Sequence, residues 1–169
     1  MRYCFALIWI VLVACSSIKS IVDFESFSKQ LEKEQKRRKC SFYPDMAYAA
    51  REQLKGKFDF IDYKLDTIYV LESINPESGS LYQSVWTNQG KLEYKIQGGE
   101  VEIVRSPFIK RLYPMIEQWD ISGIRAEEKT HGQLLDGSQM IGTRIVLNNG
   151  KFIIECFKFK EFFDMKKDQ

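Results

Sequence analysis

The feature that most constrains the fold is the dipeptide Asn149-Gly150, which lies between two segments of alternating apolar and polar residues. Asn-Gly favours a two-residue type I′ turn, because both of its residues adopt positive φ readily. Such a turn pairs Asn148 with Lys151 and predicts a hairpin formed by residues 141–148 and 151–159. The implied register matches apolar with apolar and acid with base, as stable cross-strand pairs require: Ile145 with Ile154, Leu147 with Phe152, and Arg144 with Glu155.

The segment from residue 57 to residue 105 predicts more antiparallel strands. Residues 58–74 are too long for one strand, so we expect a loop near Asp62–Asp66 and a strand that ends at Ile74. Turn residues then separate short β-rich segments. The predicted strands are Leu81–Thr87, Lys91–Gln97 and Glu100–Arg105, and the turns are Asn75–Gly79, Asn88–Gly90 and Gly98-Gly99.

Helices are predicted on both sides of these strands. Apolar spacing predicts a helix over residues 22–39, with Asp23 or Ser26 as its N-cap. A second helix should follow Pro44, with Asp45 as N-cap and Gly56 at its end. Ser106 should open a third helix, which Pro114 should kink or restart. We expect a strand over residues 121–128. The predicted fold class is α+β, with N-terminal helices packed on a curved antiparallel sheet and a C-terminal type I′ hairpin.

Composition indicates a globular protein whose partners are not nucleic acids. The chain has 169 residues, of which 44% are hydrophobic and 28% charged, values typical of one folded domain. The formal net charge is only +2. Nucleic-acid-binding proteins usually carry a clear basic excess, so this balance argues against that class.

The N-terminus has the pattern of an export signal. Arg2 precedes an unbroken apolar run from Phe5 to Ala14. Ten helical residues rise about 15 Å, half of a bilayer core of roughly 30 Å, so the run is too short to span a membrane. Its length matches the apolar region of a signal peptide.

The residues Leu12-Val13-Ala14-Cys15 resemble the lipobox of bacterial lipoproteins. That resemblance implies acylation of Cys15 with fatty acids such as palmitate, cleavage before Cys15, and a membrane anchor of two or three chains. It divides the chain into a signal peptide (1–14), a lipidated tether (15–21), one α+β domain (22–165) and a disordered tail (166–169). The alternatives are a plain secretory signal and an uncleaved anchor.

The residues that follow Cys15 bear on where the protein would be sorted. Ser16 stands where an Asp would favour retention in the inner membrane of well-studied envelopes. We therefore expect an outer-membrane lipoprotein that faces the periplasm. The basic segment 33–39 is interpreted either as a solvated helix end or as a contact for anionic headgroups near the anchor.

The cysteines do not predict a metal site. Apart from Cys15, the expected mature chain has Cys40, Cys156 and a single histidine, His131, without metal-binding spacing. We expect no cofactor. Cys40 and Cys156 could form a disulfide in an oxidising periplasm, or Cys156 could be a buried free thiol.

Catalytic candidates are few. His131 lies near Glu127, Glu128 and Asp136, and Ser138 or Ser122 would be the nucleophile of a hydrolase. No G-x-S-x-G pattern or phosphate-binding loop accompanies them, so we do not predict an enzyme.

Aromatic residues give the recognition candidates. Tyr82 and Trp86 share one face of a predicted strand, where they could stack on a sugar ring or fill a partner's pocket. The alternative is that they belong to the core, which we favour for Trp119.

The order of elements resembles cystatin-like and nuclear-transport-factor-like folds and small lipoproteins of gut Bacteroidetes. The leading hypothesis is a non-catalytic lipoprotein that binds another envelope protein, such as an immunity protein against a periplasmic toxin. The alternatives are a lipoprotein that binds a small molecule or glycan, and a hydrolase that uses His131.

Overall fold

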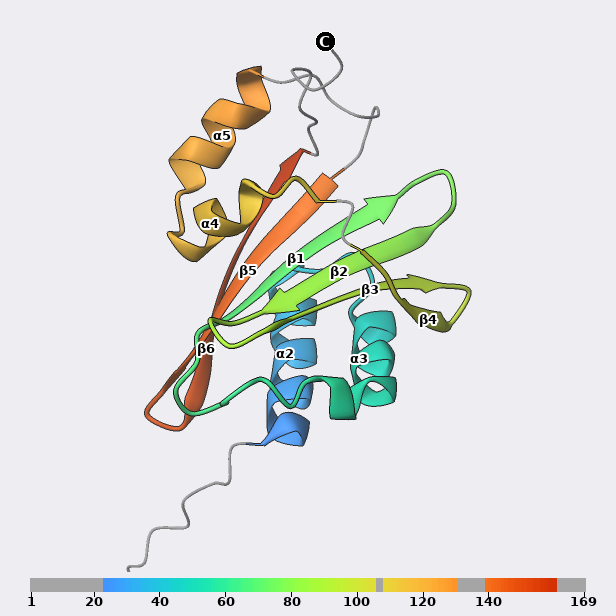
Figure 1. Ribbon diagram of the computed structural model, residues 1–169, viewed down its shortest axis with the longest axis vertical. Coiled ribbons are helices and arrows are strands. Elements are labelled where there is room, and N and C mark those ends of the chain that lie inside the picture. Colours follow the sequence, from blue (N-terminus) through green and yellow to red (C-terminus); the bar gives the residue numbers. More distant parts are fainter. Residues whose placement is uncertain (1–22, 106–107, 131–138, 161–169) are drawn as a thin grey trace, which may run out of the picture.

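The computed structural model describes residues 23–105, 108–130 and 139–160, and it has the predicted α+β architecture (Figure 1). Six antiparallel strands form one sheet in the order β4-β3-β2-β1-β5-β6. The described elements, in chain order, are α2 (Phe24–Arg38), α3 (Pro44–Gln53), the short 3₁₀ helix η1 (Lys55–Lys57), β1 (Ile68–Asn75), β2 (Ser80–Trp86), β3 (Lys91–Gln97), β4 (Glu100–Ile103), α4 (Leu112–Glu117), α5 (Ile121–Thr130), β5 (Gln139–Asn148) and β6 (Lys151–Lys160).

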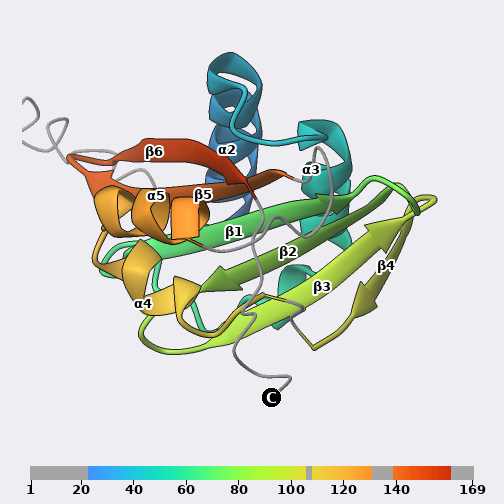
Figure 2. The same cartoon turned by 90° about the horizontal axis from the view of Figure 1, so that it is seen from above.

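Helices cover both faces of the sheet (Figure 2). The helices α2 and α3 lie on one face, and α4 and α5 lie on the other face over β5 and β6. Each face has its own apolar cluster, as expected for a layered domain. The first cluster includes Phe27, Leu31, Phe58, Val70, Val85 and Ile145. The second includes Leu71, Trp86, Leu112, Ile116, Ile124 and Phe159.

The predicted C-terminal hairpin is confirmed residue by residue. Asn149 and Gly150 have φ values of 50° and 74°, as a type I′ turn requires. All four predicted cross-strand pairs form, from Asn148 opposite Lys151 to Arg144 opposite Glu155. The guanidinium of Arg144 donates to the Glu155 carboxylate at 2.5 Å. The predicted strand Lys91–Gln97 is also confirmed at both ends.

The first helix forms as predicted, with Asp23 as the N-cap that accepts a hydrogen bond from the Ser26 amide at 2.9 Å. The prediction of Asp45 as the cap of the next helix was wrong. Tyr43 occupies that position and Pro44 begins α3, because proline at the first helical residue lacks only a donor that has no partner there. Gly56 lies in η1, beyond the end of α3.

Residues 121–128 form part of helix α5, so the predicted strand was wrong. Asp120 accepts a hydrogen bond from the Gly123 amide at 2.8 Å, the contact of a helix N-cap. Ile124 is buried one turn into this helix. Pro114 lies within the first turn of α4, where no backbone donor is needed, so it does not break the helix. Within the described residues, no helix is both long and apolar enough to cross a membrane.

Candidate functional site

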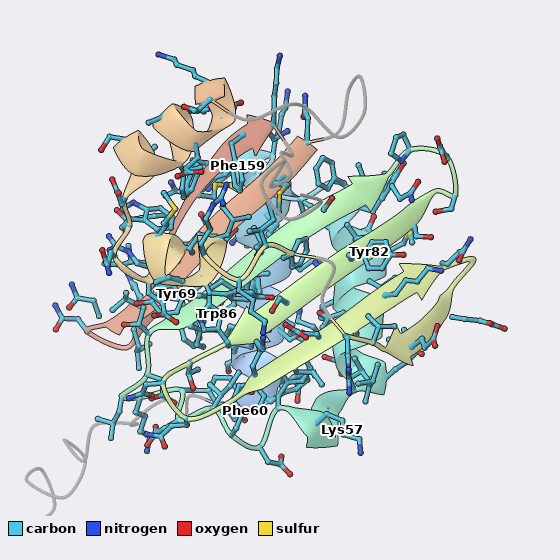
Figure 3. All side chains as sticks on the ribbon, turned by 45° about the horizontal axis from the view of Figure 1, so that its top comes forward. Lys57, Phe60, Tyr69, Tyr82, Trp86 and Phe159 are labelled. Atoms are coloured by element: carbon cyan, nitrogen blue, oxygen red, sulfur yellow. A yellow bond between two sulfur atoms is a disulfide. The ribbon has the colours of Figure 1, made fainter. Side chains whose placement is uncertain are left out.

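The two aromatic residues predicted to form a recognition site lie apart on the sheet. Trp86 is only 3% exposed, and its ring centroid is 5.5 Å from that of Tyr69 and 4.9 Å from that of Tyr113. Its indole N–H donates to Glu117 at 2.8 Å. Figure 3 shows Tyr69 and Trp86 side by side and Tyr82 farther along β2. Trp86 is therefore part of the core in this structure.

Tyr82 is half-buried and lies beside a shallow polar groove. The Lys95 ammonium is 5.9 Å from the Tyr82 ring centroid, and Lys95 also lines the groove. The groove has a volume of about 400 Å³, and its other described lining residues are Gln97, Glu100, Val101 and Glu102. Glycan binding stays a prediction in which Tyr82 would act without Trp86. Trp119 packs partly buried against Phe157 and contacts Arg144 through its ring.

Three of the six residues considered for a hydrolase lie outside the described residues, namely His131, Asp136 and Ser138. The described members have other partners. Ser122 donates to Asp120 at 2.9 Å, Glu127 pairs with Arg111 at 2.7 Å, and Glu128 pairs with Arg125 at 2.7 Å. In the part of the chain that the structure describes, no group of three potential ligands could hold a metal ion.

Cys40 and Cys156 form a disulfide, with their Cα atoms 6.0 Å apart. This separation is typical of disulfides. Cys40 follows the last turn of α2 and Cys156 lies in β6, so the bond connects the helical layer to the edge of the sheet. It closes a loop over a sequence separation of 116 residues. A bond of this kind persists in oxidising compartments such as the periplasm.

A buried polar network connects the same helices to the sheet, centred on the carboxylate of Glu72 in β1. Three side chains donate to it, from α2, from the segment after α2 and from β2: the Gln35 amide at 3.2 Å, the Ser41 hydroxyl at 2.9 Å and the Gln83 amide at 2.5 Å. Glu72 is completely buried. The network therefore fixes α2 and the residues after it against β1 and β2.

Burial dominates the electrostatics of this network. It raises the pKa of Glu72 to about 7, although the three hydrogen bonds and the charge of Arg51 act to lower it. Arg51 is 1% exposed, and burial lowers its pKa. Several buried polar atoms around Glu72 have no partner among the described residues: Gln35 Oε1, Gln83 Oε1, Arg51 Nη2 and the Tyr94 hydroxyl.

This network was not predicted from the sequence. The signal was present as an acidic residue within the apolar strand segment around Glu72, and as Arg51 one position after the buried Ala50. Buried charges are rare unless they have partners. Glu72 and Arg51 therefore each indicated a polar or charged partner on another part of the chain.

The last turn of α2 and the start of α3 form an exposed surface that we call the turn surface, which consists of Arg37, Arg38, Lys39 and Tyr43. The side chains of Arg37 and Arg38 are 59% and 42% exposed and share one carboxylate, Glu34. Tyr43 is 45% exposed. The turn surface thus combines an excess of positive charge with an exposed aromatic ring.

The turn surface is rigidly supported. Lys39 has a φ of 54°, and the Cys40 amide donates to the Gln35 carbonyl at 3.0 Å, which closes the helix as a Schellman motif. Cys40 is disulfide-bonded, and Ser41 donates to Glu72. The residues between the two helices are therefore attached to the sheet at two consecutive positions.

Comparisons with known proteins do not identify a family, because the chain matches no protein-family model, no curated protein and no solved structure. Function must therefore be argued from the surfaces of the domain.

Proposed function

We propose that this protein is a lipid-anchored, non-catalytic module that binds another protein of the cell envelope through the turn surface. The observation that carries the proposal is the exposed set of Arg37, Arg38 and Tyr43 on a backbone fixed by the disulfide. Arginine and tyrosine are enriched among the residues that dominate binding energy in protein interfaces. A fixed backbone also reduces the entropy lost on binding.

The charge of the turn surface favours a partner with an acidic contact surface. Glu34 lies beside both arginines, whereas Lys39 adds a further positive charge at the negative end of the helix dipole. Complementary charge would accelerate association and select against basic partners. A periplasmic toxin neutralised by an immunity protein is one partner of this kind. The disulfide supports an exported location, and Leu12–Cys15 supports a lipid anchor.

The position of the turn surface also fits display away from the anchor. The α2 helix has 15 residues, which corresponds to a length of about 22 Å. Its first residue follows the tether, whereas the turn surface lies at its other end. This arrangement favours protein binding over our alternative reading of residues 33–39 as a contact for headgroups.

Photo-crosslinking in cells tests the proposal. We expect a photoreactive residue in place of Tyr43 to crosslink the full-length protein to one major partner, whereas the same residue in place of Tyr82 should not. The double substitution Arg37→Glu and Arg38→Glu should weaken binding of that partner by at least about 30-fold, because losses of 2 kcal/mol or more are typical of dominant interface residues.

The matched control is Lys55→Glu with Lys57→Glu, which makes the same change in charge near the start of α2. This control should bind the partner normally. If both double variants weakened partner binding equally, the effect would be one of general charge. If position 43 gave no crosslinked product, the turn surface would not be the binding site.

A further inference from the structure

One end of the domain carries three of the five exposed large apolar side chains in the described part of the chain. Leu65, Ile153 and Val146 are 84%, 46% and 36% exposed, and the other large apolar residues exposed in the described part of the chain are Tyr43 and Ile103. Val146 and Ile153 are directly paired across β5 and β6. Because β1 begins at Ile68 opposite Ile145, Leu65 lies near the same end of the sheet. Exposed apolar groups that gather in this way indicate a contact surface.

The loop that carries Leu65 is held in place by its own hydrogen bonds. The Asp66 carboxylate accepts from the Asp62 amide at 2.7 Å, and the Asp62 carboxylate accepts from the Lys64 amide at 2.9 Å. The Leu65 amide donates to the Asp62 carbonyl at 3.1 Å. The two acidic side chains thus bind the loop backbone, while Leu65 points outward in a fixed turn.

This is the end of the domain at which the tether enters. The ring of Phe27, in the first turn of α2, lies 5.1 Å from that of Tyr63 and 5.6 Å from that of Phe152, measured between centroids. The start of α2 therefore contacts both the loop of Leu65 and the start of β6. Figure 1 shows the first turn of α2, the loop before β1 and the β5–β6 turn at one end, and Phe60 and Lys57 mark that end in Figure 3.

The chain between the anchor and the domain is short. Only eight residues separate Cys15 from Phe24, so an extended tether spans at most about 28 Å. A lipid on Cys15 would hold this end of the domain closest to the bilayer. Lys64 precedes Leu65 and Lys151 lies two residues before Ile153, and both are exposed. When apolar side chains insert shallowly into a bilayer, neighbouring lysines can contact the anionic lipid headgroups around them.

We propose that the tethered end, formed by Leu65, Val146 and Ile153 and bordered by Lys64 and Lys151, lies against the lipid surface that holds Cys15. This inference rests on the proposed lipid anchor. It defines how the protein is oriented at the membrane: contact at this end directs the turn surface away from the bilayer. The proposed contact is the bilayer surface that holds the anchor, because the short tether keeps this surface within reach. Lys64 and Lys151 favour anionic lipids in it.

Site-specific fluorescence tests this orientation on the mature lipoprotein in vesicles of phosphatidylethanolamine and phosphatidylglycerol. An environment-sensitive dye is attached to Leu65→Cys, with Tyr43→Cys as the distal control. In the lipoprotein the Cys15 sulfur is acylated and Cys40 and Cys156 are bonded, so the dye reacts with the introduced thiol. We expect a blue shift and quenching by shallow nitroxide-labelled lipids at position 65, and neither change at position 43. Ile153→Cys repeats the test if the first substitution disturbs the loop.

The outcomes separate orientation from anchoring. Emission at positions 65 and 153 that stays as in water, on protein whose intact mass includes the lipid, would overturn the orientation and leave the anchor in place. A mass without lipid would overturn both. A blue shift that depends on protein concentration and occurs without vesicles would assign this end to contact with a second copy, which also contradicts the inference.

Discussion

Replacing Cys40 and Cys156 together with alanine is expected to lower the free energy of unfolding by about 4 kcal/mol. The disulfide closes a loop over a sequence separation of 116 residues, and in the chain-entropy model such a loop stabilises the folded state by about 4–5 kcal/mol. The bond also holds Ser41 beside Glu72, so its loss should loosen the polar network. Equilibrium denaturation of both proteins by urea measures the difference.

A reducing agent provides the control for this prediction. It should destabilise the natural protein to nearly the level of the double variant, and it should leave the double variant unchanged. Equal stability of the natural protein with and without the reducing agent would show that the bond does not contribute. In the reduced protein and in the double variant, the turn surface should also lose its rigid support, which should reduce binding of the partner.

Replacing Glu72 with glutamine is expected to stabilise the protein at pH 8 by up to about 3 kcal/mol and to have little effect below pH 4.5. Burial raises the pKa of Glu72 from 4.5 to about 7 in the folded state, and each unit corresponds to 1.36 kcal/mol. Between pH 4.5 and pH 7 the Glu72 carboxyl is ionised in the unfolded chain but still protonated in the folded protein. The contribution of the Glu72 carboxyl to the free energy of unfolding is therefore fully present below pH 4.5 and is lost as the pH rises through 7.

The measured quantity is the difference in free energy of unfolding between the natural protein and Glu72→Gln at several pH values. This difference isolates the group, because paired carboxylates such as Glu34 and Glu128, whose pKa values are lowered, act in the opposite direction in both proteins. Glu77→Gln, in the exposed turn before β2, is the matched control, because it makes the same substitution at an exposed carboxylate. A constant difference between the natural protein and Glu72→Gln would contradict the prediction.

Local signals in the sequence predicted most of the strands and the register of the C-terminal hairpin. Asn149-Gly150 determined the pairing of β5 with β6, because a two-residue turn leaves no freedom in the register. The strand predicted for residues 121–128 was wrong. Ile121 and Ile124 are three residues apart, which places them on one side of a helix but on opposite faces of a strand, and the N-cap contact of Asp120 also favours a helix.

The surfaces could not be predicted, because they depend on the packing of distant elements. Trp86 and Tyr82 share one face of β2, yet α4 covers the end of β2 that carries Trp86. The indole N–H of Trp86 donates to Glu117 there. Arg37 and Arg38 lie in the last turn of α2 and Tyr43 is the N-cap of α3, so they form one surface only once the two helices pack together. Leu65 lies at the same end of the sheet as Val146 and Ile153 only once β1 pairs with β5.

Intact-mass measurement of the protein extracted from membranes tests most directly the claim on which its location and orientation depend. We expect a chain that begins at Cys15 and carries a diacylglyceryl group on the sulfur and a further acyl chain on the new amino terminus. A chain with an unmodified thiol at Cys15, or one that retains the first fourteen residues, would contradict it.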